Sequence, residues 1–198
     1  GLTALLEAAC KNSEEICKAL ICQGADPNMP SGPYSQTPLL VAAFYNSCDA
    51  ARVLLISKAD PSILSGEDSQ SPLQEAVINN SYETAQVLLL HKADPNLISG
   101  EHSLTPLLAA ALMGNMQFCQ LLLDHNADSN ATDNYGQHII WLAAQNGHRS
   151  VIELLIERGG DPQQKVKFNG RLRTAAWNAR DEGFKDLGNW LDQQKRKQ

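Results

Sequence analysis

An aspartate recurs through the chain at a nearly constant interval. Asp26, Asp60, Asp94, Asp128 and Asp161 are separated by 34, 34, 34 and 33 residues, and each follows an Ala or a Gly. A period of this length indicates an array of small supersecondary units, because one such unit cannot bury its apolar face alone and must stack on its neighbours. This period constrains the fold more than any single motif does.

The interior of each repeat has the pattern of two short helices. In the stretch 71–96, Ser71 is suited to cap a helix and Pro72 to occupy its first turn, where no amide partner is needed. Asn79-Asn80 breaks this helix, and Pro95 stops the second helix. The residues that we expect to be buried at helical spacing are Leu73, Ala76, Val77, Ala85, Val87, Leu88 and Leu89.

The repeated stretches "TPLLVAAFYNSCDAARVLLISKADPS" and "TPLLAAALMGNMQFCQLLLDHNADSN" resemble the ankyrin repeat. A tetratricopeptide array has the same period, but its Trp-Leu-Gly pattern is missing. The resemblance implies an all-α, elongated and curved solenoid of stacked helix-turn-helix units with projecting β-hairpin fingers. We expect one domain of about six units, the last a degenerate cap: 1–28, 29–62, 63–96, 97–130, 131–162 and 163–198.

The turns between units vary in a way that a binding function would use. Three fingers read "SGPYSQ", "SGEDSQ" and "SGEHSL", where Ser-Gly tolerates the positive φ of a tight turn. The finger "QQKVKFNGRLR" is longer and carries Lys165, Lys167, Arg171 and Arg173. Solvated turn charges are one interpretation of this pattern. Electrostatic selection of a partner segment is the other.

The resemblance also implies a function, which is non-catalytic binding of a protein segment or peptide in a concave groove between inner helices and fingers. The chain would then act as a scaffold, adaptor or substrate receptor. For Ile78 and Trp141, packing between adjacent repeats is the competing interpretation. The positions that match the variable groove and finger sites are Tyr34, Phe44, Tyr45, Glu67, Asp68, Ile78, Glu101, His102, Leu112, Met113, Tyr135, Trp141, Phe168 and Arg171.

Three further hypotheses remain open at this stage. The chain starts inside a repeat, so we expect a piece of a longer protein, in which it would be a regulatory or targeting region of an enzyme or channel. Lipid or nucleic acid binding through residues 165–173 is another alternative, against which the net charge of −6 argues. Asn28, Asn96 and Asn130 resemble the asparagine that a hydroxylase modifies in ankyrin proteins.

Composition restricts the remaining classes. An apolar content of 43% and a charged content of 19% are typical of a chain that folds around a core, and no apolar run approaches the length of about 20 residues that spans a bilayer. The five cysteines form no CxxC pair, and the five histidines have no metal-ligand spacing. We therefore expect no enzyme, metal or cofactor, and a monomer with reduced thiols in the cytoplasm, with the nucleus as the alternative.

Overall fold

Short paired helices make up most of the computed structural model, which describes residues 3–194. The chain divides into two compact units, residues 1–101 and 102–198. The helices of the first unit are α1 (Ala4–Cys10), α2 (Glu14–Cys22), α3 (Pro38–Phe44), α4 (Cys48–Ile56), α5 (Pro72–Ile78) and α6 (Tyr82–Leu90). The elements of the second unit are α7 (Pro106–Leu112), α8 (Met116–Asp124), α9 (Ile139–Gln145), α10 (Arg149–Glu157), β1 (Lys165–Phe168), β2 (Arg171–Thr174), α11 (Ala175–Asp181) and α12 (Lys185–Gln193).

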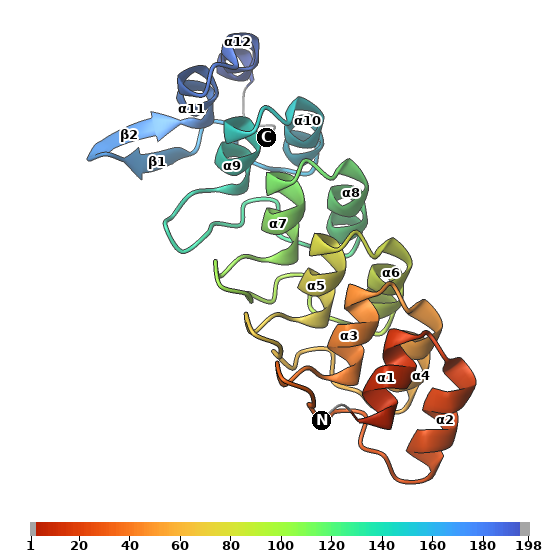
Figure 1. Cartoon of the computed structure of the whole chain (residues 1–198). Coiled ribbons are helices and arrows are strands. Elements are labelled where there is room, and N and C mark those ends of the chain that lie inside the picture. Colours follow the sequence, from red (N-terminus) through yellow and green to blue (C-terminus); the bar gives the residue numbers. More distant parts are fainter. Residues whose placement is uncertain (1–2, 195–198) are drawn as a thin grey trace. The chain divides into compact units, whose positions relative to one another are not determined.

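The helices of the first unit form two rows. Among the shorter helices, α3 contacts both α1 and α5, and the longer helices α2, α4 and α6 form the second row (Figure 1). Alanines such as Ala42, Ala51 and Ala76 are fully buried, and these small side chains allow neighbouring helices to pack closely. Leu73 and Leu88 fill the space between the rows, as the helical spacing predicts.

The shorter helices of the first unit begin at hydroxyl caps that also join neighbouring repeats. Thr37 Oγ1 accepts the backbone N–H three residues later at 3.2 Å, and Ser71 Oγ does the same, which confirms the predicted cap. The N–H of Thr37 itself donates to Ser65 Oγ in the following finger at 3.2 Å, and that of Ser71 donates to Ser99 Oγ at 3.1 Å. Each finger therefore completes the start of the preceding short helix.

An asparagine turns the chain between the two helices of each pair in the first unit. Asn12, Asn46 and Asn80 adopt positive φ angles of 52°, 54° and 56°, a conformation that asparagine tolerates better than most residues. Asn12 Oδ1 also accepts the N–H groups of Asp49 and Ala50 at 3.0 Å each. The turn of one repeat thus caps the long helix of the next, whose own Ser47 makes no side-chain cap bond.

The second unit repeats the same pairing with different turn chemistry. α7 contacts α9, α9 contacts α11, and α8 contacts α10. His148 Nε2 lies 3.1 Å from the Leu112 carbonyl oxygen. A Cβ on Gly114, which has a φ of +69°, would lie 2.5 Å from this imidazole ring, so the turn needs glycine for both reasons.

The fingers differ from the expected hairpins in one respect. In the described residues, only β1 and β2 form a two-stranded antiparallel ladder, with Val166 opposite Arg173 (Figure 1). The fingers after α2 and α4 close through single bridges, Ser31 to Gln36 and Ser65 to Gln70. The longer finger has room for a ladder and turns at Asn-Gly, the dipeptide that suits a two-residue hairpin turn.

The last helix pair is tightly packed but polar on its outside. A Cβ on Gly188 would lie 2.7 Å from the Ala176 carbonyl oxygen, so glycine allows α11 and α12 to approach closely. The guanidinium of Arg180 donates to the Gly188 carbonyl oxygen at 3.1 Å and pairs with Asp192. Exposed residues of α12 include Lys185, Asp186, Asn189, Asp192 and Gln193.

Candidate partner-binding surface

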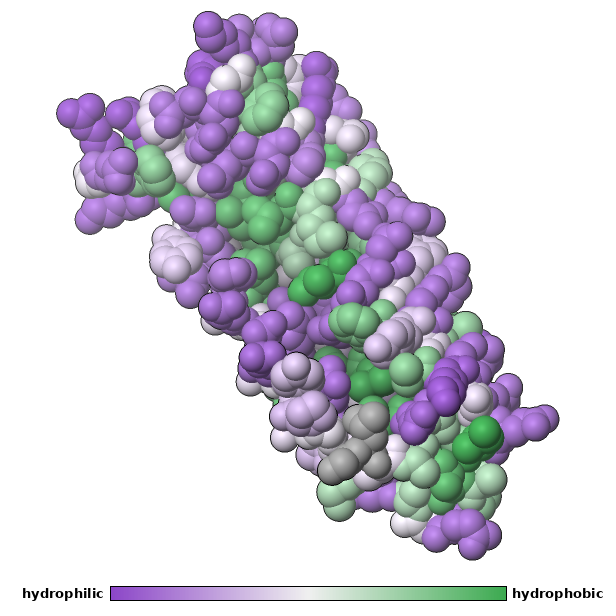
Figure 2. Space-filling model, in the orientation of Figure 1, coloured by the Kyte–Doolittle hydropathy of each residue, from purple (hydrophilic) through white to green (hydrophobic). Residues whose placement is uncertain are grey.

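Large apolar side chains are exposed at the C-terminal end of α3 and on the finger that precedes it. Phe44 ends α3 and is 42% exposed, and the neighbouring Tyr45 is 57% exposed. Their rings meet edge to face with centroids 4.8 Å apart. Tyr34 lies at the finger tip and is also exposed. Figure 2 shows apolar surface over the region of α1 and α3, beside hydrophilic atoms of the fingers.

Two cavities flank Phe44, and Tyr34, Gln36 and Phe44 line both of them. One cavity, of about 370 Å³, lies toward α1 and is lined in addition by Leu6, Val41 and Tyr45 among others, so its walls are largely apolar. The only charges in its lining, Lys11 and Glu7, pair with each other at 2.9 Å. This first cavity is called the apolar cavity below.

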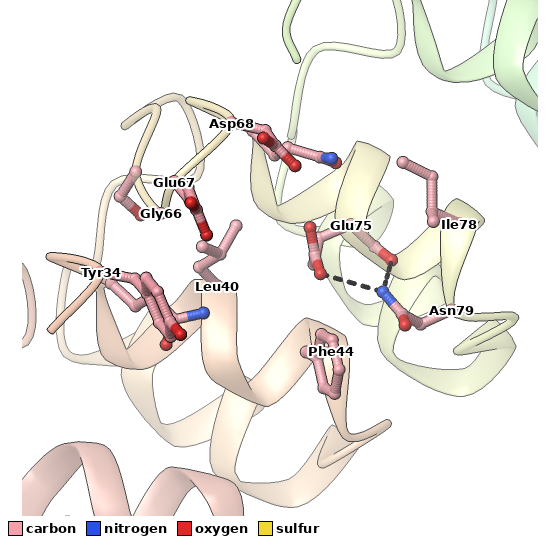
Figure 3. A pocket seen from close by; sticks show the side chains of 12 residues that line it. Tyr34, Leu40, Phe44, Gly66, Glu67, Asp68, Glu75, Ile78 and Asn79 are labelled. Carbon is pink, nitrogen blue, oxygen red and sulfur yellow. Dashed lines mark hydrogen bonds between the residues drawn. The ribbon is translucent and has the colours of Figure 1, made fainter. Parts of the chain in front are cut away.

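The second cavity, of about 310 Å³, lies toward α5 and is called the acidic cavity (Figure 3). Glu67 and Asp68 reach it from the finger, and Glu75 reaches it from α5. Leu40, Phe44 and the Tyr34 ring supply apolar wall. The predicted positions Tyr34, Phe44, Glu67, Asp68 and Ile78 therefore meet around one hollow.

Glu75 is a residue of this surface that the sequence interpretation missed. Its side chain is only partly exposed, and burial raises the pKa of its carboxyl group, with a smaller contribution from the negative charge of Asp68. A hydrogen bond of 2.9 Å from Asn79 Nδ2 opposes this shift of the pKa. Glu75 precedes Ile78 by three residues and Asn79 by four, so helical spacing places all three on one face of α5.

The predicted positions of the second unit fall into two groups. Leu112 and Met113 at the end of α7 are partly exposed, and Tyr135 is 75% exposed at a finger tip. Trp141 is only 1% exposed, so the prediction that it contacts a partner is wrong and the competing interpretation of packing is correct. Glu101, the last residue of the first unit, and His102, the first residue of the second unit, are both exposed.

The hairpin explains why Trp141 is buried. Phe168 of β1 lies 5.8 Å from Trp141, ring centre to ring centre, and Trp177 of α11 stacks on Trp141 at 6.2 Å. Arg173 places its guanidinium over the Trp177 ring at 4.8 Å. A cavity of about 280 Å³ borders this cluster, and exposed Arg171 contributes to its lining. The predicted residues Phe168 and Arg171 therefore border the same hollow.

The asparagines named as hydroxylation candidates are engaged in the structure. Asn28 Oδ1 accepts the N–H of Asp60 at 2.7 Å, and its amide donates to the Lys58 carbonyl oxygen at 3.3 Å. Asn130 makes the matching bonds to Asp161 and Gly159. For Asn96, a backbone bond to Asp94 Oδ1 gives the same local turn. The side chains of Asn28 and Asn130 therefore join adjacent repeats.

Cys17 and Cys119 are buried free thiols, and burial raises the pKa of Cys119 to about 12.

Within residues 3–194, no group of three or more His, Cys, Asp or Glu side chains is arranged to hold a metal ion. Over the same residues, no helix is both long enough and apolar enough to cross a bilayer.

Comparison with known families agrees with this arrangement. The family model described as ankyrin repeats (3 copies) matches residues 1–65 and 73–166. The matched residues make up more than half of the 198-residue chain and include every helix from α1 to α10 except part of α5. No curated protein matches the chain.

Proposed function

The chain belongs to the ankyrin repeat family, and we propose that it binds an extended segment of a partner protein along its short helices and fingers. Ankyrin repeats are generally protein–protein interaction modules. The proposal includes a stack of six repeat units, of which α11 and α12 form the cap, and a monomer that acts as an intracellular scaffold, adaptor or substrate receptor.

One observation supports this proposal above the others, which is the exposed aromatic group formed by Tyr34, Phe44 and Tyr45. These side chains border two adjoining hollows instead of being scattered singly over the surface. A contiguous apolar surface with polar residues at its edge is typical of an interaction site. Aromatic side chains are also enriched at the centres of protein interfaces.

The magnitudes show what else such binding needs. Complete burial of three large apolar side chains contributes roughly 1.5–3 kcal/mol each. Association itself costs about 4–15 kcal/mol in lost freedom. Contacts with Tyr34, Phe44 and Tyr45 therefore leave little net affinity, and polar contacts must add both affinity and selectivity.

The test uses a display library of random linear peptides selected against the whole chain. Selected peptides are then titrated against the wild type and the double variant Phe44→Ala, Tyr45→Ala. Loss of two interface aromatics is expected to weaken binding by about 30-fold or more. The matched control is the double variant Ile56→Ala, Leu90→Ala, which removes exposed apolar side chains from α4 and α6. Equal affinities of wild type and a folded Phe44→Ala, Tyr45→Ala variant would contradict the proposal.

A further inference from the structure

We propose that the acidic cavity is a selectivity site that receives one arginine side chain of the bound segment. The inference rests on the proposed function, and it adds the chemical identity of one ligand residue. Three carboxyl groups line the cavity, from Glu67, Asp68 and Glu75. Figure 3 shows Glu67 and Glu75 on opposite sides of the hollow, one on the finger and one on α5.

Among residues 3–194, no Lys or Arg side chain forms an ion pair with these carboxylates. The ion pairs formed by residues 3–194 use other acidic groups, and no Lys or Arg lines the acidic cavity. The charge of the surroundings has the same sign, because residues 1–101 contain twelve acidic and five basic residues. A cationic ligand group would therefore enter a site where complementary charge is already assembled.

One partly buried carboxylate, that of Glu75, and one buried amide oxygen, that of Gln70, favour a ligand that donates hydrogen bonds. Glu75 is partly removed from water, which makes its charge costly unless a cation is near. Gln70 also lines the cavity, and its Oε1 atom is buried without a hydrogen-bond partner among the described residues. Unpaired buried acceptors are uncommon in folded proteins, and a guanidinium carries five N–H donors that can satisfy several acceptors.

The walls of the cavity favour arginine over a metal ion. The carboxylates do not converge into a group that could hold a metal within the described part of the chain. Tyr34, Leu40 and Phe44 instead offer aromatic and aliphatic surface. A guanidinium stacks on aromatic rings, while its aliphatic stem packs against apolar surface. A volume of about 310 Å³ is at the lower end for ligand pockets, as one side chain requires.

The adjoining apolar cavity predicts the neighbour of that arginine. Tyr34, Gln36 and Phe44 separate the two hollows, so a segment that crosses them meets an apolar site and an acidic site in succession. The ligand class is therefore an extended segment with an apolar residue close to an arginine. Phe44 would contact both of these ligand residues.

The test uses the peptides selected from the random library by the whole chain. Arginine should be enriched at one position near an apolar position. For the best peptide, replacement of this arginine by citrulline, which keeps the shape but removes the charge, should weaken binding about 10- to 100-fold, the usual effect of losing charged hydrogen bonds. Replacement by lysine should cause an intermediate loss, because an ammonium does not match two carboxylates or stack in the same way.

The protein variants locate the effect. Glu67→Gln, Glu75→Gln should weaken binding of the arginine peptide strongly and leave the citrulline peptide nearly unchanged, since the two changes remove the same interaction. Glu15→Gln, an exposed position on α2, is the matched control and should change neither affinity. Thermal unfolding of each variant verifies that the fold is retained.

The outcomes separate this inference from the proposed function. If no peptide is selected by the wild type, both proposals fail. If peptides are selected and their binding depends on Phe44 and Tyr45, but arginine is not enriched, the function stands and the inference is overturned. Equal affinities for the arginine and citrulline peptides would overturn it as well.

Discussion

The Nδ1 atom of His138 accepts the backbone N–H of Trp141 at 3.3 Å, so an imidazole caps α9 where a hydroxyl caps α3, α5 and α7. The opposite ring nitrogen, Nε2, lies 3.0 Å from the Gln164 carbonyl oxygen and donates to it. This pair of bonds requires the neutral tautomer with its proton on Nε2. Burial disfavours the charged imidazolium and lowers the pKa of His138 from 6.5 to about 4.

The first prediction concerns stability in mild acid. The pKa of His138 in the folded state is below its unfolded value, so the unfolded chain binds more protons between pH 6.5 and about 4. The free energy of unfolding should therefore decrease as the pH is lowered from 6.5 to about 4. In His138→Thr, which restores a hydroxyl cap, the fall should be smaller by up to about 3 kcal/mol. Urea unfolding of both proteins at several pH values measures the difference, and parallel curves would contradict this assignment.

The second prediction concerns the turn at Asn46. Its Oδ1 accepts the N–H of Thr84 at 3.2 Å, and its φ is 54°. The variant Asn46→Gly loses the cap but keeps access to positive φ. It should lower the free energy of unfolding by about 1 kcal/mol. The variant Asn46→Ala loses the cap and also disfavours the positive φ, so it should lower the free energy of unfolding by about 2–3 kcal/mol. Denaturant unfolding compares the two variants, and equal losses would show that backbone conformation contributes nothing here.

The third prediction tests the burial of Trp141. Trp141→Ala should lower the free energy of unfolding by about 3–5 kcal/mol, because the Trp177 and Phe168 rings lose the surface on which they pack. Tyr135→Ala, at an exposed finger tip, should change stability by less than about 0.5 kcal/mol. Thermal unfolding provides the measurement. A small effect at Trp141 would return it to the candidate ligand contacts.

The fourth prediction concerns the thiols. Burial raises the pKa of Cys119 to about 12, so its reactive thiolate is nearly absent at neutral pH and a reagent cannot reach it. Cys22 is exposed and should be alkylated by iodoacetamide in the native protein, whereas Cys119 should react only after denaturation. Peptide mass spectrometry of timed samples distinguishes the two sites. Equal labelling rates in native buffer would contradict the buried placement.

The sequence was sufficient for those features that local chemistry determines. The Ser71 cap and the helix break at Asn79-Asn80 depend on a few neighbouring residues, and the structure has both. Five of the twelve residues that line the acidic cavity were also identified, because each repeat of the family presents the same positions to its surface. What the repeat pattern does not report is how deeply a side chain is covered.

Trp141 and Glu75 illustrate this limit. The resemblance implied that Trp141 would face the groove, but residues about 30 positions later, in the hairpin and α11, cover it. Glu75 looks like an ordinary surface glutamate in the sequence, and its partial burial arises only when the finger and α3 lie beside it. Both outcomes depend on packing between repeats, which a linear pattern does not contain.

The hydrogen bonds between repeats have a consequence for any shortened form of the first unit. Thr37 obtains its acceptor from the following finger, while the N–H groups of Asp49 and Ala50 obtain theirs from the preceding turn. Neighbours therefore depend on each other in both directions along the chain. A cut between two repeats leaves unpaired donors on both sides of it, so repeat boundaries are poor places to divide this protein, although the sequence period marks them clearly.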